Sequence, residues 1–143
     1  MAFADRSIRE FADAVGERTP APASGSATAV TAALAAALVE LTARFSDDDA
    51  TLREAMRLRA RLLELADEDA DAYAEFMRTH SDEARQRTID VPRELAEHAT
   101  RLAELGKQLE RAGNQNLLGD ANAAVLIAEA AARTAARLVE LNS

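Results

Sequence analysis

Apolar residues recur along most of the chain with the period of a helix face. Near the start, Ile8, Phe11, Ala12 and Val15 follow one another at steps of three, one and three positions, which places them on one helix face, and the same period returns in four later segments. No segment alternates apolar and polar residues as a half-buried strand would. The pattern predicts an all-α fold, a bundle of about five mostly long antiparallel helices in a single domain over residues 1–143. The first two expected helices cover residues 6–15 and about 26 to 45. The third starts within residues 46–49 and extends to about residue 77. The fourth is capped by residue 90 and extends to residue 113, and the fifth is capped by residue 120 and extends to about residue 141.

Capping residues set these boundaries. Asp5 or Ser7 can cap the first helix, and the "SDDD" stretch at 46–49 offers several oxygens to the third. The segment around His80 and Ser81 is polar and typical of a turn. After it, Asp90 can cap a helix that carries Pro92 in its first turn, where the missing amide hydrogen costs nothing.

The second expected helix is the most apolar part of the chain. No charged residue occurs from Pro20 to Val39, and alanine predominates. The run is too short and too alanine-rich for a membrane span, and Glu40 and Arg44 follow on the same helix. We therefore expect a helix surrounded by other helices at the centre of the bundle.

Three charged residues interrupt the apolar stripe of the third helix. Arg59 falls in its middle, whereas Asp69 and Asp67 lie at opposite edges. Arg59 and Asp69 are ten residues apart, about 15 Å along one helix, so their partners must come from another helix or another chain. They form either ion pairs or a site in which a partly desolvated carboxylate has a proton affinity suited to acid–base work.

Two further polar stretches have a structural and a functional interpretation. Ser24, Gly25 and Ser26 either form an ordinary loop and helix cap or let a ligand approach the backbone amides of the helix start. Asn114, Asn116 and Asp120 either cap helices or present an amide and a carboxylate to a small heterocycle. We expect His80 and His98 to be solvated surface residues.

Composition and charge narrow the classes of function. A net charge of -8 argues against binding to nucleic acid, which depends on lysine and arginine. The chain contains no cysteine, so disulfides, zinc–thiolate sites and thiol catalysis are excluded, and no metal-binding motif is present. The charged N-terminal segment does not resemble a signal peptide. We expect a cytoplasmic protein that binds neither nucleic acid nor membrane.

Four stretches, in order along the chain, resemble the cyclodeaminase/cyclohydrolase family. They are "TPAPASGSATAVTAALAAALVEL", "LRARLLELADEDADAY", "VPRELAE" and "GNQNLLGDANAAVLIAEAA". They are similar to the family's P-A-P-G-G-G-S stretch with its small-residue helix, its L-R-x-x-L-x-x-L-x-D-x-D-x-x-A-[FY] helix, its V-P-L-x-x-A and its G-N-x-N-x-x-S-D. The resemblance covers about residues 7 to 142.

That resemblance implies a helical bundle that forms a homodimer and has a folate-binding cleft. It implies hydrolysis of 5,10-methenyltetrahydrofolate or cyclisation of 5-formiminotetrahydrofolate with loss of ammonia, with the folate as substrate and no covalently bound cofactor. A carboxylate would steady the amidinium-like carbon and move a proton. The implied catalytic residues are Asp69 and Asp67, and the implied substrate-binding residues are Ser24, Gly25, Ser26, Arg59, Asn114 and Asp120.

The chain also departs from the family pattern. The family's three-glycine loop is here Ala23-Ser24-Gly25, and the stretch between Tyr73 and Pro92 is shorter than in family members. In the closing N-V-x-x-N-L pattern, Leu138 replaces the first asparagine and Asn142 matches the second. These departures leave a second hypothesis open, a catalytically reduced helical dimer that binds a small ligand or a protein.

Overall fold

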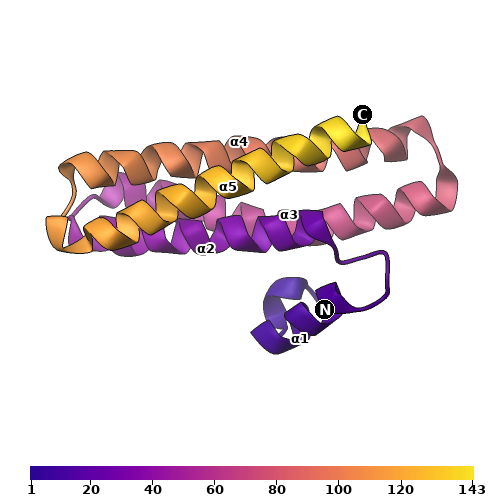
Figure 1. Cartoon of the computed structure of the whole chain (residues 1–143), viewed down its shortest axis with the longest axis horizontal. Helices are drawn as coiled ribbons and strands as arrows, with labels where there is room; N and C mark the ends of the chain where they lie inside the picture. Colours follow the sequence, from indigo (N-terminus) through magenta and orange to yellow (C-terminus); the bar gives the residue numbers. More distant parts are fainter.

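The structure is a computed structural model that describes all residues, 1–143. It contains five α-helices and two short 3-10 helices. The α-helices are α1 (Ile8–Gly16), α2 (Ser24–Phe45), α3 (Asp49–Thr79), α4 (Asp82–Ala112) and α5 (Leu118–Asn142); the 3-10 helices are η1 (Phe3–Asp5) and η2 (Gln115–Leu117). Helices α2 to α5 pack against one another as an elongated antiparallel bundle, and α1 lies apart from it (Figure 1). The all-α bundle predicted from the sequence is confirmed.

Alanine in α2 lets the other helices approach closely. Ala32, Ala35 and Ala36 have no exposed surface and belong to one core cluster with buried leucines of α3 and α4. By length and composition α2 could cross a membrane, but 61% of its most apolar window is buried inside the bundle. It is the core helix that the sequence predicted.

Helix α4 begins earlier than predicted. Ser81, not Asp90, is its N-cap, and the Ser81 side chain accepts a hydrogen bond from the Ala84 amide. Asp82 and Glu83 in the first turn favour a helix start there because they lie near its positive end. Pro92 consequently lies inside α4 rather than in its first turn.

The start of α5 also differs from the prediction. The helix begins at Leu118 after Leu117, which provides no side-chain cap, and Asp120 lies in the first turn instead of capping it. The preceding 3-10 helix is capped by Asn114, whose side chain accepts from the Asn116 amide. The chain therefore enters α5 from another helical turn and needs no separate cap.

The N-terminal segment is attached to the bundle mainly through η1. The Phe3 amide donates a hydrogen bond of 3.0 Å to an Asp67 carboxyl oxygen on α3. Helix α1 has the predicted amphipathic start with a Ser7–Glu10 capping box, but none of its residues is buried. Its apolar face does not contribute to the core.

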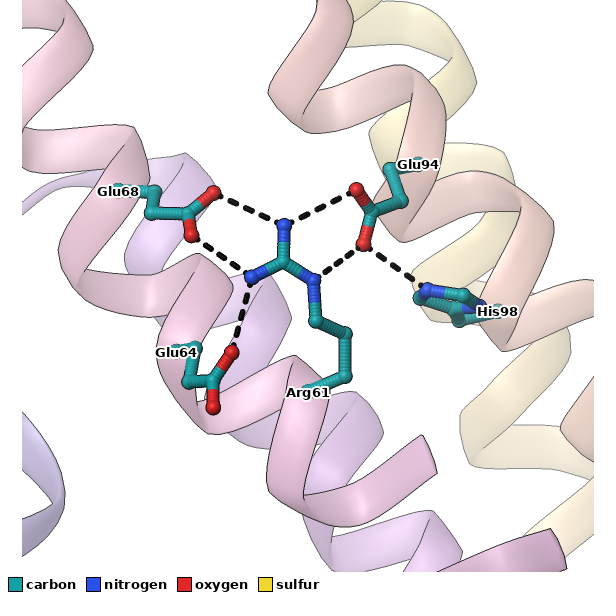
Figure 2. Close-up of polar contacts among 5 residues, drawn as sticks. All are labelled: Arg61, Glu64, Glu68, Glu94 and His98. Atoms are coloured by element: carbon teal, nitrogen blue, oxygen red, sulfur yellow. Dashed lines mark hydrogen bonds and ion pairs between the residues drawn. The ribbon is translucent and has the colours of Figure 1, made fainter. Parts of the chain in front are cut away.

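A network of charged side chains joins α3 to α4 across their surface (Figure 2). The Arg61 guanidinium donates to Glu64 and Glu68 on its own helix and to both oxygens of Glu94 on α4. The hydrogen bonding of Arg61 to Glu94 lowers the pKa of Glu94 below its ordinary value. His98 lies 3.0 Å from Glu94 and its side chain is 21% exposed, so it is a partly buried member of this network rather than a fully solvated residue, whereas His80 is exposed as predicted.

The network predicts that Arg61→Lys destabilises the fold although it keeps the charge. A lysine ammonium is a single compact charge and cannot form the paired hydrogen bonds that the guanidinium makes to both oxygens of Glu68 and of Glu94, so the bridge to Glu94 weakens. Partly exposed ion pairs contribute little each, and we expect a loss of about 1 kcal/mol in the free energy of unfolding, measured with urea. Arg78→Lys, in a solvent-exposed pair within α3, is the matched control and should leave stability unchanged. Equal effects of the two substitutions would contradict a structural role for the network.

Candidate functional site

A cleft of about 210 Å³ opens at the end of the bundle where α2 begins. It brings together the loop before α2, the second half of α3, the start of α4 and the end of α5. Its lining residues are Pro20, Ala21, Ala23, Ser24, Gly25, Asp69, Tyr73, Thr88, Leu138 and Asn142. Of the residues predicted to form a site, Ser24, Gly25 and Asp69 meet here.

The backbone of α2 and the side chain of Asp69 approach each other very closely in this cleft. A Cβ atom built on Gly25 would lie 2.2 Å from each of the three carboxyl atoms of Asp69. Any side chain at this position would therefore displace the carboxyl group. Gly25 is needed here for close approach, not for backbone conformation, because none of the glycines has a positive φ.

Burial raises the pKa of Asp69 above its ordinary value of 3.8. No protein group donates a hydrogen bond to this carboxyl group, although the start of α2 lies against it. A carboxylate without donors in a partly desolvated site binds a proton more readily than one in water. Asp69 is therefore the candidate group for proton exchange with a ligand in the cleft.

The first turn of α2 offers amide hydrogens beside this carboxyl group. The first intrahelical bond runs from the Ala27 amide to the Ala23 carbonyl, so the amides of Ser24, Gly25 and Ser26 have no acceptor in the protein, and Ser24 and Gly25 line the cleft. A helix start favours a negative charge or an oxygen atom of a ligand. The cleft therefore combines hydrogen-bond donors with a group that accepts protons. No three His, Asp or Glu side chains of the chain are grouped so that they could hold a metal ion.

Three other predicted site residues have structural partners outside the lining of the cleft. The Ser26 hydroxyl is fully buried and donates a hydrogen bond of 2.6 Å to the Ala66 carbonyl, which fastens α2 to α3. Asp67 accepts from the Phe3 amide. Arg59 donates through Nε and Nη2 to the buried Glu40 of α2, as the need for a partner on another helix predicted.

Asn114 and Asp120 lie at the other end of α2. The Asn114 amide donates to the Ser46 hydroxyl, and its side chain donates to the Phe45 carbonyl. Helix α2 has 22 residues and is about 33 Å long, so this end is far from Gly25. Within one chain these two residues do not line the cleft that contains Asp69.

Sequence reasoning missed several residues of the cleft, among them Tyr73, Thr88 and Asn142. Tyr73 follows Asp69 by four positions on α3, a spacing that places both on one helix face and could have identified it. Thr88 precedes Asp90, the predicted start of α4, so the helix pattern gives no reason to place it in the site. Asn142 matched the closing family pattern but was not assigned a place in the site.

Comparisons with known proteins agree with this structure. The family model described as "Formiminotransferase-cyclodeaminase" matches residues 7–143. The chain is 25% identical to the methenyltetrahydrofolate cyclohydrolase of Methylorubrum extorquens, over 97% of this chain and 80% of that protein. It is 31% identical to the formimidoyltransferase-cyclodeaminase of Rattus norvegicus over 81% of this chain, but spans only 26% of the rat protein.

A solved structure gives the same result for the fold. The crystal structure of formiminotetrahydrofolate cyclodeaminase from Thermotoga maritima superposes with a TM-score of 0.93 and 26% identity, over 97% of this chain and 79% of that one. The family match extends over nearly the whole chain and includes every residue of the cleft. The chain therefore belongs to the formiminotransferase-cyclodeaminase family.

Proposed function

We propose that this protein is a folate one-carbon enzyme that acts as a methenyltetrahydrofolate cyclohydrolase or a formiminotetrahydrofolate cyclodeaminase. The observation that carries the proposal is the carboxyl group of Asp69, held against Gly25 in a cleft where burial raises its pKa. The relatives named above support the folate as substrate. The other hypothesis, a catalytically reduced dimer, is not favoured, because the cleft retains a carboxyl group able to exchange protons.

Both the hydrolysis and the cyclisation need a group that stabilises a positive charge on the folate and transfers a proton. In the hydrolysis, water attacks the carbon between N5 and N10 of the cationic methenyl form, the bond to N5 breaks, and one proton is released with the 10-formyl product. In the cyclisation, N10 attacks the formimino carbon and ammonia leaves after gaining a proton. Ionised Asp69 would stabilise the cation, take the proton from water or N10, and return it to the leaving nitrogen.

The size of the cleft indicates which part of a folate it holds. Its volume of about 210 Å³ is below the ~300 Å³ at which typical small-molecule pockets begin. We infer that the fused ring and the one-carbon bridge enter the cleft beside Asp69, while the rest of the folate extends outside. We further propose that the protein works in the cytoplasm, binds no covalent cofactor, and binds neither nucleic acid nor membrane.

The proposal predicts opposite effects of Asp69→Asn on turnover and on stability. Turnover of both 5,10-methenyl and 5-formimino substrates should fall at least about a hundredfold, because the amide cannot take a proton. Since the folded state raises the Asp69 pKa, the native protein binds the proton more tightly than the unfolded chain, and ionisation costs stability as the pH rises. Asp69→Asn should therefore be more stable than the parent at neutral pH, and this difference should shrink as the pH falls towards 3.8.

The measurements are the decay of methenyl absorbance, the release of ammonia, and urea unfolding at several pH values. Asp71→Asn, an exposed change two residues away on α3, is the control and should alter neither turnover nor stability. The parent should lose activity at acidic pH around an apparent pKa above 3.8. A parent protein that leaves both substrates at their uncatalysed rates would sink the proposal.

We also propose that the protein forms a homodimer through the outer face of α2. Leu34, Leu41 and Phe45 are 61%, 37% and 59% exposed, and they follow one another at steps of seven and four on this helix. Leu38 lies between them and is partly buried. An apolar stripe on the helix that forms the core of the bundle is typical of a subunit interface.

A twofold axis near the middle of α2 would also explain how Asn114 and Asp120 can belong to the site although they lie far from Asp69 within one chain. Two α2 helices that pack in antiparallel orientation place the end of one beside the start of the other. The partner subunit's Asn114 and the partner subunit's Asp120 would then approach the cleft that contains Asp69. In this arrangement the two residues close the site from the other subunit.

The dimer hypothesis predicts that Leu34→Arg yields a folded monomer. The charged side chain would have to be desolvated at the interface, so association should weaken at least about a hundredfold. Light scattering over a range of concentrations measures the mass, and circular dichroism checks the helical content. Ile8→Arg, on the exposed face of α1, is the control and should leave the dimer intact. A monomeric parent protein, or a dimer that survives Leu34→Arg, would contradict the interface.

A further inference from the structure

The end of α5 is attached to α4 at a backbone position that a proline leaves open. Proline has no amide hydrogen, so Pro92 inside α4 cannot donate to the carbonyl four residues earlier, which belongs to Thr88. The Asn142 side chain donates to this carbonyl through Nδ2, at 2.8 Å. A residue 54 positions away therefore supplies the hydrogen bond that the helix has lost.

This hydrogen bond fixes which way the Asn142 amide points. A backbone carbonyl only accepts hydrogen bonds, so the nitrogen of the amide must face Thr88 and the oxygen must face away from it. No protein group donates to that oxygen, and no buried polar side-chain atom of the chain lacks a partner. The oxygen of Asn142 is thus accessible and held in one orientation.

Thr88 and Asn142 both line the cleft that contains Asp69. We propose that the Asn142 oxygen accepts a hydrogen bond from a ring N–H of the heterocycle bound there, and that the Thr88 carbonyl and Pro92 orient it for this purpose. This inference rests on the proposed function and adds a residue that recognises the substrate. Asp69 would meet the one-carbon centre, and Asn142 would meet an N–H donor of the fused ring.

Because Pro92 is the reason that the Thr88 carbonyl needs Asn142, the structural role of Asn142 can be separated from its proposed contact with the ligand. Asn142→Ala removes the donor to Thr88 and the acceptor for the ligand together. Pro92→Ala returns an amide hydrogen to α4, which can satisfy the Thr88 carbonyl without Asn142. The double variant Pro92→Ala/Asn142→Ala therefore restores the backbone hydrogen bond but not the ligand contact.

The test measures unfolding and steady-state kinetics for the parent and these three variants. Asn142→Ala should lower stability and raise KM about tenfold, with kcat changed by less than about threefold, since a hydrogen bond to bound substrate is lost. In the double variant the stability lost through Asn142→Ala should be regained, whereas KM should remain about tenfold above that of the parent. A double variant that regains the parent's KM would show a purely structural role and overturn the inference.

Asn142→Asp provides a test that does not depend on how Pro92→Ala folds. The carboxylate keeps an acceptor for the ligand but directs a second oxygen at the Thr88 carbonyl. The stability should be highest in the parent, lower in Asn142→Ala and lowest in Asn142→Asp. The KM should be lowest in the parent, higher in Asn142→Asp and highest in Asn142→Ala. If KM follows the same order as the loss of stability, the proposed contact is wrong.

Titration with 5-formyltetrahydrofolate, a stable folate, separates this inference from the proposed reaction. A parent protein that turns over substrate while the double variant keeps the parent's KM overturns the role of Asn142 alone. If the parent binds the folate without turnover, the reaction is wrong, and weaker binding by the double variant still supports Asn142. A parent that neither binds nor turns over a folate overturns both.

Discussion

The cleft depends on the contact between the carboxyl group of Asp69 and the backbone of α2 at Gly25. Only a residue without a Cβ allows the carboxyl group to lie there, because the added atom would be 2.2 Å from it. Partial burial in the cleft, of which this contact is a part, raises the pKa of the carboxyl group, and the contact places the group beside the start of a helix. Packing at this backbone position thereby contributes to the proton affinity of the group to which we assign the chemistry.

Other interactions hold the walls of the cleft in place around this contact. The hydroxyl of Ser26 donates a hydrogen bond to the Ala66 carbonyl of α3. This hydrogen bond fixes the position of α2 against α3 just after Gly25. On the opposite wall, Asn142 joins the end of α5 to the α4 carbonyl that Pro92 leaves without a donor. All four long helices therefore contribute to the geometry, although only a few side chains face the ligand.

Much of the fold could be predicted from the sequence because helix period and capping are local properties. The central position of α2 followed from its uncharged run, and the need of Arg59 for a partner on another helix was met by Glu40. Pro92 misled the prediction of α4, because a proline is least costly in a first turn and nothing local indicated that Asn142 would satisfy Thr88. The separation of Asn114 from Asp69 followed from the length of α2, which motif order does not reveal. Gly25 and Asp69 were foreseen in the site from the family resemblance, but their contact required the structure.

The most direct test of this account is a carbon NMR titration of the Asp69 carboxyl group in the parent protein and in Gly25→Ala. Alanine suits a helix, so the fold should persist while its Cβ pushes the carboxyl group towards solvent. We predict a pKa above 3.8 in the parent and a value closer to 3.8 in Gly25→Ala. An Asp69 that titrates at its ordinary value in the parent, or whose pKa is the same in both proteins, would contradict the account.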